Sequence, residues 1–320
     1  MIKFDTMTNS PNLNVQLAPR HGKGLLLSNP VILASGVAGY GREYAEITDI
    51  QKLGAIVCKG TMLLPRKGNL QPRLVETAYG LLNSVGLENM GVDALVMQEA
   101  PVWAEWRVPV IVNVAGEVED EYVAVACRLE GVPGISGIEL NISCPNISAG
   151  GMEFGVDPRL AGQLTSAVKS ATTLPLIVKL SPNVTHIEEI ALAVEEAGAD
   201  AISLINTLKG MAIDVGKRKP CLGNVAGGLS GPAIKPVALH MVFQVAGAVH
   251  IPVIGCGGIG SAEDALEFIM AGATAIEIGT AALTNPDIGL AVLDGIENFM
   301  LKNGVRNLAD LVGAARQSAG

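Results

Sequence analysis

The sequence predicts a (β/α)8 barrel, the TIM-barrel architecture, with long loops inserted after strands 2 and 6. Eight short aliphatic segments recur along the chain, and segments with helical periodicity separate most of them. Hydrophobic residues make up 49% of the 320 residues and aromatic residues only 3%, so Val, Ile, Leu and Ala must fill the core. That composition suits parallel strands buried on both faces. An open doubly wound sheet is the alternative for such an alternation.

The eight aliphatic segments are the expected strands. In chain order they are "VILAS" (31–35), "AIVCK" (55–59), "VPVIVNVAG" (108–116), "GIELNIS" (137–143), "PLIVKLS" (175–181), "AISLIN" (201–206), "IPVIGCGG" (251–258) and "AIEIGT" (275–280). Because eight βα units typically need about 250 residues, a chain of 320 residues leaves room for insertions.

Two of the intervening segments show clear helix signals. "THIEEIALAVEEAG" opens with Thr185 three residues before Glu188, and "SAEDALEFIMAG" opens with Ser261 three residues before Asp264. This spacing is typical of a capping box. Each segment ends at a glycine, as a left-handed cap requires, in the matching stretches "EAGADAISL" and "MAGATAIEI".

Two connections are too long for simple βα loops. The first starts at Thr61 and contains "KGNLQPR" and "GLLNSVGLEN". The second follows strand 6 and contains "TLKGMAIDVGKRKPCLGN" and "GGLSGPAIKP". Long loops in compact domains tend to be lids or binding loops. No linker or low-complexity segment divides the chain, so residues 1–320 are expected to form a single barrel domain.

Charge and cysteine usage exclude several classes of function. A formal net charge of −9 argues against nucleic acid or an anionic membrane as the main partner. The start "MIKFDTMTNS" has no apolar stretch typical of a signal peptide, and no apolar run reaches the ~18 residues of a membrane span. We therefore expect a cytoplasmic protein. The scattered cysteines and histidines show no disulfide framework and no metal-ligand spacing, so no metal site is expected.

Nearly every expected strand ends in a polar group or a glycine. A barrel places its active site at the carboxyl ends of its strands, so these residues are the first candidates for a site. They are Ser35, Lys59, Asn113, Asn141 with Ser143, Lys179, Asn206, Gly257 with Gly258, and Gly279 with Thr280.

Two of these strand ends carry a lysine. A single lysine after an apolar run can extend from the barrel rim into solvent. Two of them, Lys59 and Lys179, on one rim among amides favour contact with a ligand.

The late glycines indicate a phosphate site. "GCGGIG" after strand 7 and "GTA" after strand 8 leave backbone N–H groups free to bind an anion at the usual phosphate location of such barrels. The alternative is a tight turn that merely needs small residues. These residues alone do not distinguish a flavin from a sugar phosphate.

Cys144 stands apart from the other cysteines. A buried cysteine is usually an inert small hydrophobe, which is the expectation for Cys58 and Cys127. Cys144 instead follows a strand end and precedes Pro145, which favours an extended backbone at the cysteine. No histidine adjoins it to activate a nucleophile, whereas a proton-abstracting thiolate is compatible with this position.

Taken together, these segments resemble the class 1B dihydroorotate dehydrogenases, specifically their FMN-binding catalytic subunit. The resemblance extends from about Leu25 to Pro286. It depends on "ASGVAGYGREY", "KGTMLLPRKGN", "LLNSVGLEN", "ELNISCPN", "GGMEFG", "KLSPNVT", "SLINTLKGMAID", "GGLSGPAIKP" and "GGIGSAEDALEFIMAGA", all in order.

The resemblance implies oxidation of (S)-dihydroorotate to orotate in pyrimidine biosynthesis, with Cys144 removing the C5 proton while hydride passes from C6 to FMN. It implies substrate contacts from Lys59, Asn83, Ser84, Val85, Gly86, Leu87, Asn141, Asn146, Asn206 and Thr207. It implies FMN contacts from Ser35, Lys59, Gly60, Asn113, Asn141, Lys179, Ile205, Gly231, Gly257, Gly258, Gly279 and Thr280.

The resemblance also implies partners. Class 1B chains form a homodimer at the core of a heterotetramer and pass electrons to NAD+ through a second subunit, which holds FAD and a [2Fe-2S] cluster. Three alternatives remain open: a dihydropyrimidine dehydrogenase-like barrel that also uses a cysteine base, a Schiff-base aldolase that uses Lys179, and a non-catalytic scaffold for the electron-transfer subunit.

Overall fold

Eight parallel strands close into a barrel in the computed structural model, which describes residues 10–143, 145–146 and 152–316. The strands are β3 (Val31–Leu33), β4 (Ala55–Val57), β7 (Val110–Val114), β8 (Gly137–Asn141), β11 (Leu176–Lys179), β12 (Ala201–Leu204), β17 (Val253–Cys256) and β18 (Ala275–Ile278). Each pairs in parallel with the next in chain order, and β18 pairs with β3 to close the ring. All eight lie within the expected segments, so the (β/α)8 prediction is confirmed and the open sheet is excluded.

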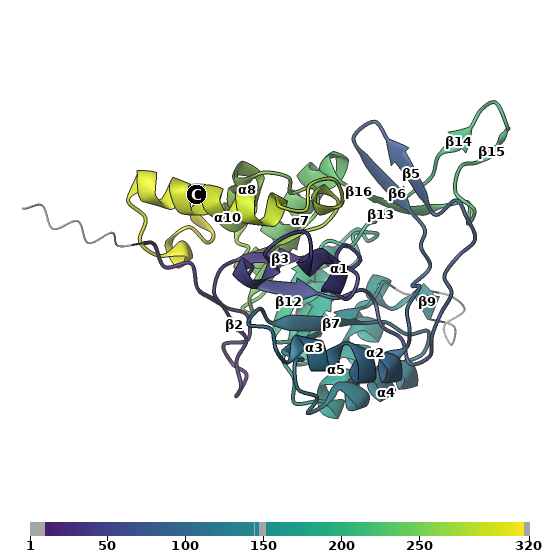
Figure 1. Cartoon of the computed structure of the whole chain (residues 1–320), viewed down its shortest axis with the longest axis horizontal. Coiled ribbons are helices and arrows are strands. Elements are labelled where there is room, and N and C mark those ends of the chain that lie inside the picture. The colour runs from purple at the N-terminus through teal and green to yellow at the C-terminus, as the bar shows by residue number, and fades with distance from the viewer. Residues whose placement is uncertain (1–9, 144, 147–151, 317–320) are drawn as a thin grey trace, which may run out of the picture.

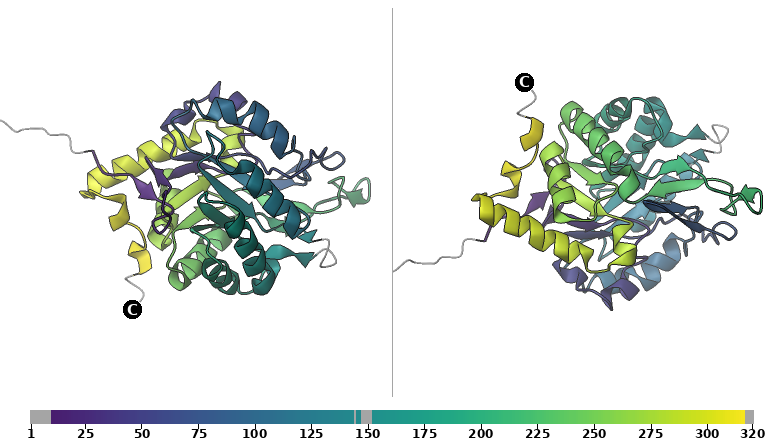
Figure 2. Two further views of the ribbon diagram at one scale, coloured as in Figure 1. Left: turned by 90° about the horizontal axis from the view of Figure 1, so that it is seen from below. Right: turned by 90° about the horizontal axis from the view of Figure 1, so that it is seen from above.

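Helices surround the barrel and cover the outer faces of its strands (Figure 2). The longer ones are α4 (Glu119–Leu129), α5 (Pro158–Ala171), α6 (Ile187–Glu196), α7 (Lys235–Ala248), α8 (Ala262–Ala271) and α10 (Ile288–Asn303). The shorter ones are α1 (Arg42–Ala45), α2 (Val92–Gln98), α3 (Ala100–Trp103) and α9 (Ala281–Thr284), with 3-10 turns at Ile50–Lys52, Phe154–Val156, Pro232–Ile234, Leu308–Asp310 and Ala314–Arg316. The core between helices and strands consists mainly of buried Val, Ile, Leu and Ala.

The two helix-start predictions have different outcomes. Ser261 is the N-cap of α8, and its hydroxyl accepts a hydrogen bond from the backbone N–H of Asp264. The prediction for α6 is wrong, because its N-cap is His186 and no side chain caps it. The glycines after both helices have positive φ, +100° at Gly198 and +124° at Gly272, as expected of left-handed caps.

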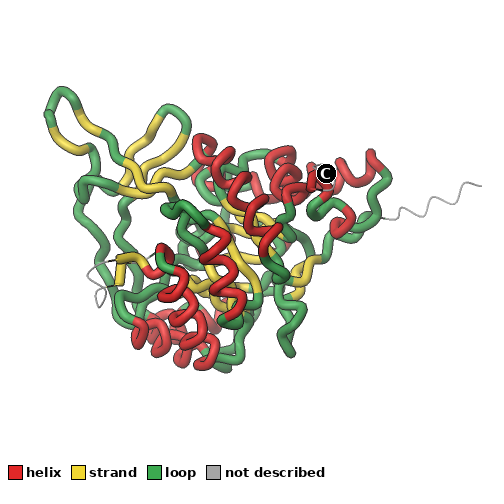
Figure 3. Tube along the Cα trace, turned by 180° about the vertical axis from the view of Figure 1, so that it is seen from behind, coloured by secondary structure: helices red, strands yellow, loops and turns green. Residues whose placement is uncertain are grey.

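The two long connections form one antiparallel sheet, here called the extension sheet. The first contributes β5 (Leu74–Thr77) and β6 (Gly80–Asn83), and the second contributes β13 (Leu208–Gly210) and β16 (Gly227–Ser230). Their order is β13-β16-β6-β5, so β16 and β6 join the two connections. The sheet projects from the end of the barrel opposite α10 (Figures 1 and 3). The sequence predicted both insertions but not that they pair.

Three small hairpins complete the fold. They are β1 (Val15–Gln16) with β2 (Leu26–Leu27), β9 (Pro145–Asn146) with β10 (Met152–Glu153), and β14 (Ile213–Asp214) with β15 (Lys219–Pro220). The last lies at the tip of the second insertion (Figure 1). No helix within the described part of the chain is long and apolar enough to cross a membrane.

Candidate active site

The carboxyl ends of neighbouring barrel strands bring the expected polar residues to one mouth of the barrel. Because paired residues of adjacent strands share a face of the sheet, the register places side chains in common layers. Lys179 pairs with Asn141 on one side and with Ser203 on the other. Glu139 pairs with Asn113, and Cys256 pairs with Glu277. The barrel interior, apolar elsewhere, is therefore polar at this end.

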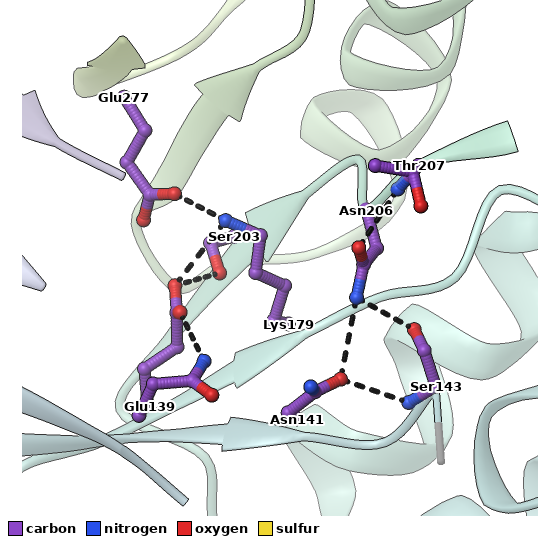
Figure 4. Close-up of polar contacts among 9 residues, drawn as sticks. Glu139, Asn141, Ser143, Lys179, Ser203, Asn206, Thr207 and Glu277 are labelled. Carbon is purple, nitrogen blue, oxygen red and sulfur yellow. Dashed lines mark hydrogen bonds and ion pairs between the residues drawn. The ribbon is translucent and has the colours of Figure 1, made fainter. Parts of the chain in front are cut away.

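Amides and hydroxyls form the first cluster of the site. The Asn206 amide donates to Asn141 Oδ1 at 3.2 Å and to Ser143 Oγ at 3.0 Å, while its own Oδ1 accepts from the backbone N–H of Thr207 at 2.8 Å. The Ser143 N–H donates to Asn141 Oδ1 at 3.1 Å. These four residues come from the ends of β8 and β12 and fix one another (Figure 4). They present amide and hydroxyl groups suited to ring carbonyls and N–H groups of a ligand.

The extension sheet brings a loop, residues 83–87, beside this cluster. The Asn83 amide donates to the carbonyl of Gly228 at 3.2 Å, and a Cβ added at Gly228 would lie 1.9 Å from Thr207 Oγ1. Gly228 thus joins two of the expected substrate residues. On the barrel side, a Cβ added at Gly60 would lie 3.1 Å from Leu87 Cδ2 and 3.2 Å from Asn113 Oδ1. Gly60 therefore packs between the loop and the barrel mouth.

Asn69 holds the rest of this loop, although it was not among the predicted site residues. Its amide donates to Ser84 Oγ at 3.0 Å, and its backbone N–H donates to the carbonyl of Val85 at 2.9 Å. Gly86 follows with φ +77°, and a Cβ there would lie 2.5 Å from the Asn69 side chain. Only glycine fits that close approach.

Glycines form the second cluster, here called the glycine cradle, which consists of Gly231, Gly257, Gly258, Gly279 and Thr280. Positive φ values of +93°, +129° and +77° at the first three require glycine. A Cβ at Gly258 would lie 3.0 Å from the Gly231 carbonyl oxygen, and Thr280 Oγ1 donates to Ser230 Oγ at 2.8 Å.

The cradle brings together the ends of β16, β17 and β18. Ile205, another expected cofactor residue, adjoins it, because its backbone N–H donates to the Cys256 carbonyl at 2.8 Å. Small residues and backbone N–H groups at this location suit an anion such as a phosphate.

Beside the amide and hydroxyl cluster lies a group of three ionisable side chains, the buried charge triad of Lys179, Glu139 and Glu277 (Figure 4). The Lys179 ammonium bonds Glu277 and lies 3.6 Å from Glu139 Oε2. The side chains are 7% exposed for Lys179 and 0% for the two glutamates. Glu139 also accepts from Asn113 Nδ2 at 2.7 Å and from Ser203 Oγ at 2.8 Å.

The triad shifts the pKa values of its members in different directions. Burial opposes the charge of Lys179, but Cys256, Glu139 and Glu277 outweigh it and hold the Lys179 pKa well above its usual value. Burial also opposes the Glu139 charge, yet Lys179 and hydrogen bonds from Glu277, Ser203 and Asn113 lower its pKa. Burial and the neighbouring Glu139 charge raise the pKa of Glu277 to about 8, against the attraction of Lys179.

Lys59 and Ser35 lie at the rim on the β3–β4 side. The Lys59 backbone N–H donates to the Gly39 carbonyl at 2.8 Å, and its ammonium lies 5.7 Å from the centroid of the Tyr40 ring. Among the described residues no carboxylate pairs with this ammonium, in contrast to Lys179. Lys59 is therefore the lysine whose charge is free to bind an anionic ligand group. Ser35 directly follows Ala34, whose N–H donates to the Ile278 carbonyl at 3.0 Å.

The proposed base, Cys144, lies outside the described residues. Its neighbours on both sides are placed: Ser143 belongs to the amide and hydroxyl cluster, and the backbone of Pro145–Asn146 pairs with Met152–Glu153. The side chain of Asn146 also lies outside the description. In the described ranges, no three His, Cys, Asp or Glu side chains gather where they could hold a metal ion.

Four polar residues of the site were not predicted to contribute to it: Glu139, Ser203, Cys256 and Glu277. The signal for the glutamates was present in "GIELNIS" and "AIEIGT", where a carboxylate interrupts an apolar strand. Such a residue is almost never buried unless it is paired. Lys179 interrupts its strand in the same way, so each of the three charges could have been recognised as buried, but their pairing depends on the closed ring.

The chain is similar to known proteins over nearly its whole length. The family model described as dihydroorotate dehydrogenase matches residues 20–300. A dihydroorotate dehydrogenase B (NAD(+)) catalytic subunit from Desulforamulus reducens is 55% identical, over 95% of this chain and 99% of the relative. Proteins of the same description from Pelobacter propionicus and Desulforudis audaxviator are 53% and 54% identical, covering 95% and 93% of this chain and 98% and 97% of those relatives.

A solved structure shares the fold. It is the crystal structure of DHODH in complex with ferulenol from Eimeria tenella, which matches with a TM-score of 0.78 at 21% identity and covers 99% of this chain and 92% of that chain. At this identity the likeness supports the barrel alone. The family match and the three relatives go further: the chain belongs to the dihydroorotate dehydrogenase family.

Proposed function

We propose that this chain is the catalytic subunit of an NAD+-type, class 1B dihydroorotate dehydrogenase, which oxidises (S)-dihydroorotate to orotate in pyrimidine biosynthesis. The observation that carries the proposal is the arrangement of the barrel mouth. An amide and hydroxyl cluster, a buried lysine and a glycine cradle follow one another along β8, β11, β12, β17 and β18. This order suits a planar heterocycle with a phosphate tail next to a small polar ring.

The residues present fit FMN. Backbone N–H groups of the cradle of Gly231, Gly257, Gly258, Gly279 and Thr280 would hold the phosphate, and only glycine fits at the first three positions, where a Cβ would lie 2.9 Å or less from other protein atoms. Nearer the barrel axis, Lys179, Asn113 and Asn141 would hold the ring, with Ser35, Lys59, Gly60 and Ile205 lining the rim. When bound, FMN supplies the hydride acceptor of the reaction. The cation of Lys179 would favour negative charge on it.

The substrate would lie against the amide and hydroxyl cluster. Lys59, whose ammonium pairs with no carboxylate in the described part of the chain, would bind the carboxylate. Residues 83–87, Asn141, Asn146, Asn206 and Thr207 would bind the ring carbonyls and N–H groups. Cys144 would remove the C5 proton. Because a free thiol has a pKa near ~8.5, its thiolate fraction and the reaction rate should rise toward alkaline pH.

The charge state of Lys179 argues against the aldolase alternative. A Schiff-base lysine must lose its proton, so its pKa has to be depressed. The buried carboxylates do the opposite and hold the Lys179 pKa well above its usual value. The glycine cradle therefore belongs to a barrel in which the central lysine, Lys179, stays positively charged.

The name of the relatives, catalytic subunit, implies a partner that transfers electrons. We propose that this partner holds FAD and a [2Fe-2S] cluster and passes electrons to NAD+, that two copies of the chain form the core of a heterotetramer, and that residues 1–320 act as one domain in the cytoplasm. Large apolar side chains are exposed on the two long connections, among them Leu70, Leu74, Tyr79, Ile213 and Val215. Exposed apolar residues of this kind favour a protein interface on these connections.

Spectroscopy tests the proposal directly. The purified protein should absorb as a flavoprotein, dihydroorotate should bleach that absorption under anaerobic conditions, and NAD+ should restore it only when the electron-transfer subunit is present. A yellow protein that dihydroorotate does not bleach would support the scaffold alternative. A colourless protein that borohydride traps on a carbonyl substrate would support the aldolase.

Gly258→Ala should weaken FMN binding at least about tenfold, or ~1.4 kcal/mol. The new Cβ would lie 2.9 Å from Lys235 N and 3.0 Å from the Gly231 oxygen, within the cradle. Gly304→Ala is the matched control, since φ there is +67° and nothing lies within 4 Å. Both changes strain the backbone by roughly 1 kcal/mol, but only the first should change the FMN dissociation constant, measured by fluorescence titration. If the two variants have equal FMN dissociation constants, the glycine cradle does not bind the phosphate.

A further inference from the structure

The buried charge triad contains one cation and two acids. Lys179 is the only ammonium that Glu139 and Glu277 contact among the described residues. With all three groups ionised, the triad would have a net charge of −1 on side chains that are at most 7% exposed. An uncompensated buried charge is costly, so one of the two carboxyl groups is expected to keep a proton.

The hydrogen bonds identify which carboxyl keeps it. Glu139 accepts from Asn113 and Ser203 and lies close to Lys179, so both of its oxygens have partners that favour the ionised form. Glu277 accepts a hydrogen bond from Lys179 through one oxygen, and its Oε1 finds no donor among the described residues. With a proton, Glu277 can donate to Glu139, and a hydrogen bond between these carboxyl groups lowers the Glu139 pKa and raises that of Glu277.

Among the described residues, no other group beside Glu277 can replace it as the proton carrier. On β17, burial raises the pKa of the Cys256 thiol to about 12, so this thiol stays neutral. On the other side of Glu277, strand β3 contributes Val31, Ile32 and Leu33 and no titratable side chain. The remaining charged neighbours are Lys179 on β11 and Glu139 on β8.

We propose that Glu277 is a positioning residue for the reaction: it holds the single proton of the buried charge triad, which keeps the Lys179–Glu139 pair neutral and leaves the Lys179 ammonium able to face negative charge on the cofactor. The location of the proton on Glu277 is argued from the residues of this chain alone. The effect of that proton on the cofactor rests on the proposed function. Loss of this proton would give the triad a charge of −1 and would disfavour a second negative charge beside it.

The sign of the pH dependence follows from the raised pKa. Glu277 titrates near its ordinary value of 4.5 in the unfolded chain and at about 8 in the folded one. The folded state therefore binds more protons than the unfolded state between these values, so Glu277 makes the protein less stable as pH rises from about 5 to 8. Above pH 8, Glu277 is ionised in both the folded and the unfolded state, so it no longer makes stability depend on pH. Glu277→Gln keeps the shape of the side chain but cannot titrate, so this variant lacks the pH dependence that Glu277 causes.

The first experiment compares unfolding of the full-length, flavin-free chain between pH 5 and 9 for the wild type, Glu277→Gln and Glu139→Gln. Relative to wild type, Glu277→Gln should gain stability as pH rises to about 8, by up to tenfold in the unfolding constant per pH unit. In Glu139→Gln, the remaining carboxyl can ionise beside Lys179, so the same dependence should disappear. If the difference in stability between Glu277→Gln and the wild type is the same at every pH, Glu277 contributes only a structural hydrogen bond.

Infrared spectroscopy of the wild type gives a second measurement that needs no variant to fold. A carboxylic acid C=O band should be present at pH 6 and should decline with a midpoint near pH 8. Absence of the band at pH 6 would overturn the proposal. Where Glu277→Gln folds, loss of the band in this variant assigns it.

The third measurement is the reduction potential of the bound flavin from pH 6 to 9. Above about pH 8, reduction should take up one more proton in the wild type than in Glu277→Gln. A tenfold change per pH unit is about 30 mV for a two-electron couple, and the wild-type slope should be steeper by this amount. Equal slopes would remove the link to the cofactor. A protein that binds no flavin would contradict the proposed function and leave the stability and infrared results as the test of the proton.

Discussion

Cys144→Ala should bind FMN with parental affinity and should lose most of its flavin reduction by dihydroorotate, by about 10²–10⁴-fold, the usual contribution of a general base. Alanine removes the thiol and leaves the hydrogen bonds of the adjoining cluster, in which Asn206 bonds Ser143 and Asn141. Because the cofactor and most substrate contacts remain, binding should change much less than the rate of proton removal. Anaerobic stopped-flow absorption measures that rate directly.

Cys127→Ala is the matched control for this experiment. The expectation that Cys127 is buried is wrong: it lies exposed on α4, away from the barrel mouth, so the variant should reduce flavin at the parental rate. In the wild type the rate should rise with pH as the thiol ionises, and this rise should be absent from the residual rate of Cys144→Ala. If Cys144→Ala reduces flavin as fast as the wild type, Cys144 is not the base.

The barrel could be predicted from the sequence because its strands are local signals. A segment such as "LIVK" in β11, where every position is buried, can be recognised as a strand from its own residues, without reference to any other segment. The register of neighbouring strands then follows from closure of the ring. For the same reason the strand-end candidates met at one mouth: parallel strands bring their carboxyl ends to the same edge. Asn141, Lys179 and Asn206 were identified in this way.

The extension sheet could not be predicted because its pairing is not local. β6 and β16 are short, Gly228 pairs with Asn83, and the two are far apart in the chain. Neither strand has the long alternating pattern that would identify it, and glycines occupy two of the four positions in β16. The long loops were recognised as binding elements, but their geometry depends on each other. Asn69, which clamps the loop over the site, was missed for this reason.

Only one of the three residues of the buried charge triad was predicted. Lys179 was identified from its unusual place in an apolar strand, whereas Glu139 and Glu277 were not assigned a role. Charges in separate strands are recognisable as partners only when the ring brings β8, β11 and β18 around one interior. Because Lys179 already pairs with two carboxyl groups, the effect of its positive charge on a cofactor depends on whether those carboxyl groups are protonated.

Lys179→Met should therefore destabilise the chain strongly, by about 3–5 kcal/mol, the typical cost of removing one partner from a buried ion pair. Methionine has a similar length and leaves Glu139 and Glu277 buried without a cation. Both acids must then bind protons in the folded state, so their pKa values rise above the unfolded ones. By linkage, the variant should lose stability progressively as pH rises from about 4.5, and urea unfolding at pH 5 and pH 8 should show the larger deficit at pH 8.

The triple change Lys179→Met, Glu139→Gln and Glu277→Gln separates charge from packing. It removes all three charges at similar volume, so most of the lost stability should return and the added pH dependence should vanish. FMN should still bind weakly or with a lowered potential, because the cation is gone. Lys169→Met is the control: its partner Asp200 also bonds the backbone N–H of Leu176, and Lys169 is 27% exposed, so about 1 kcal/mol or less is expected. If Lys179→Met and Lys169→Met lose equal stability at both pH values, Glu139 and Glu277 are not buried acids whose charge depends on Lys179.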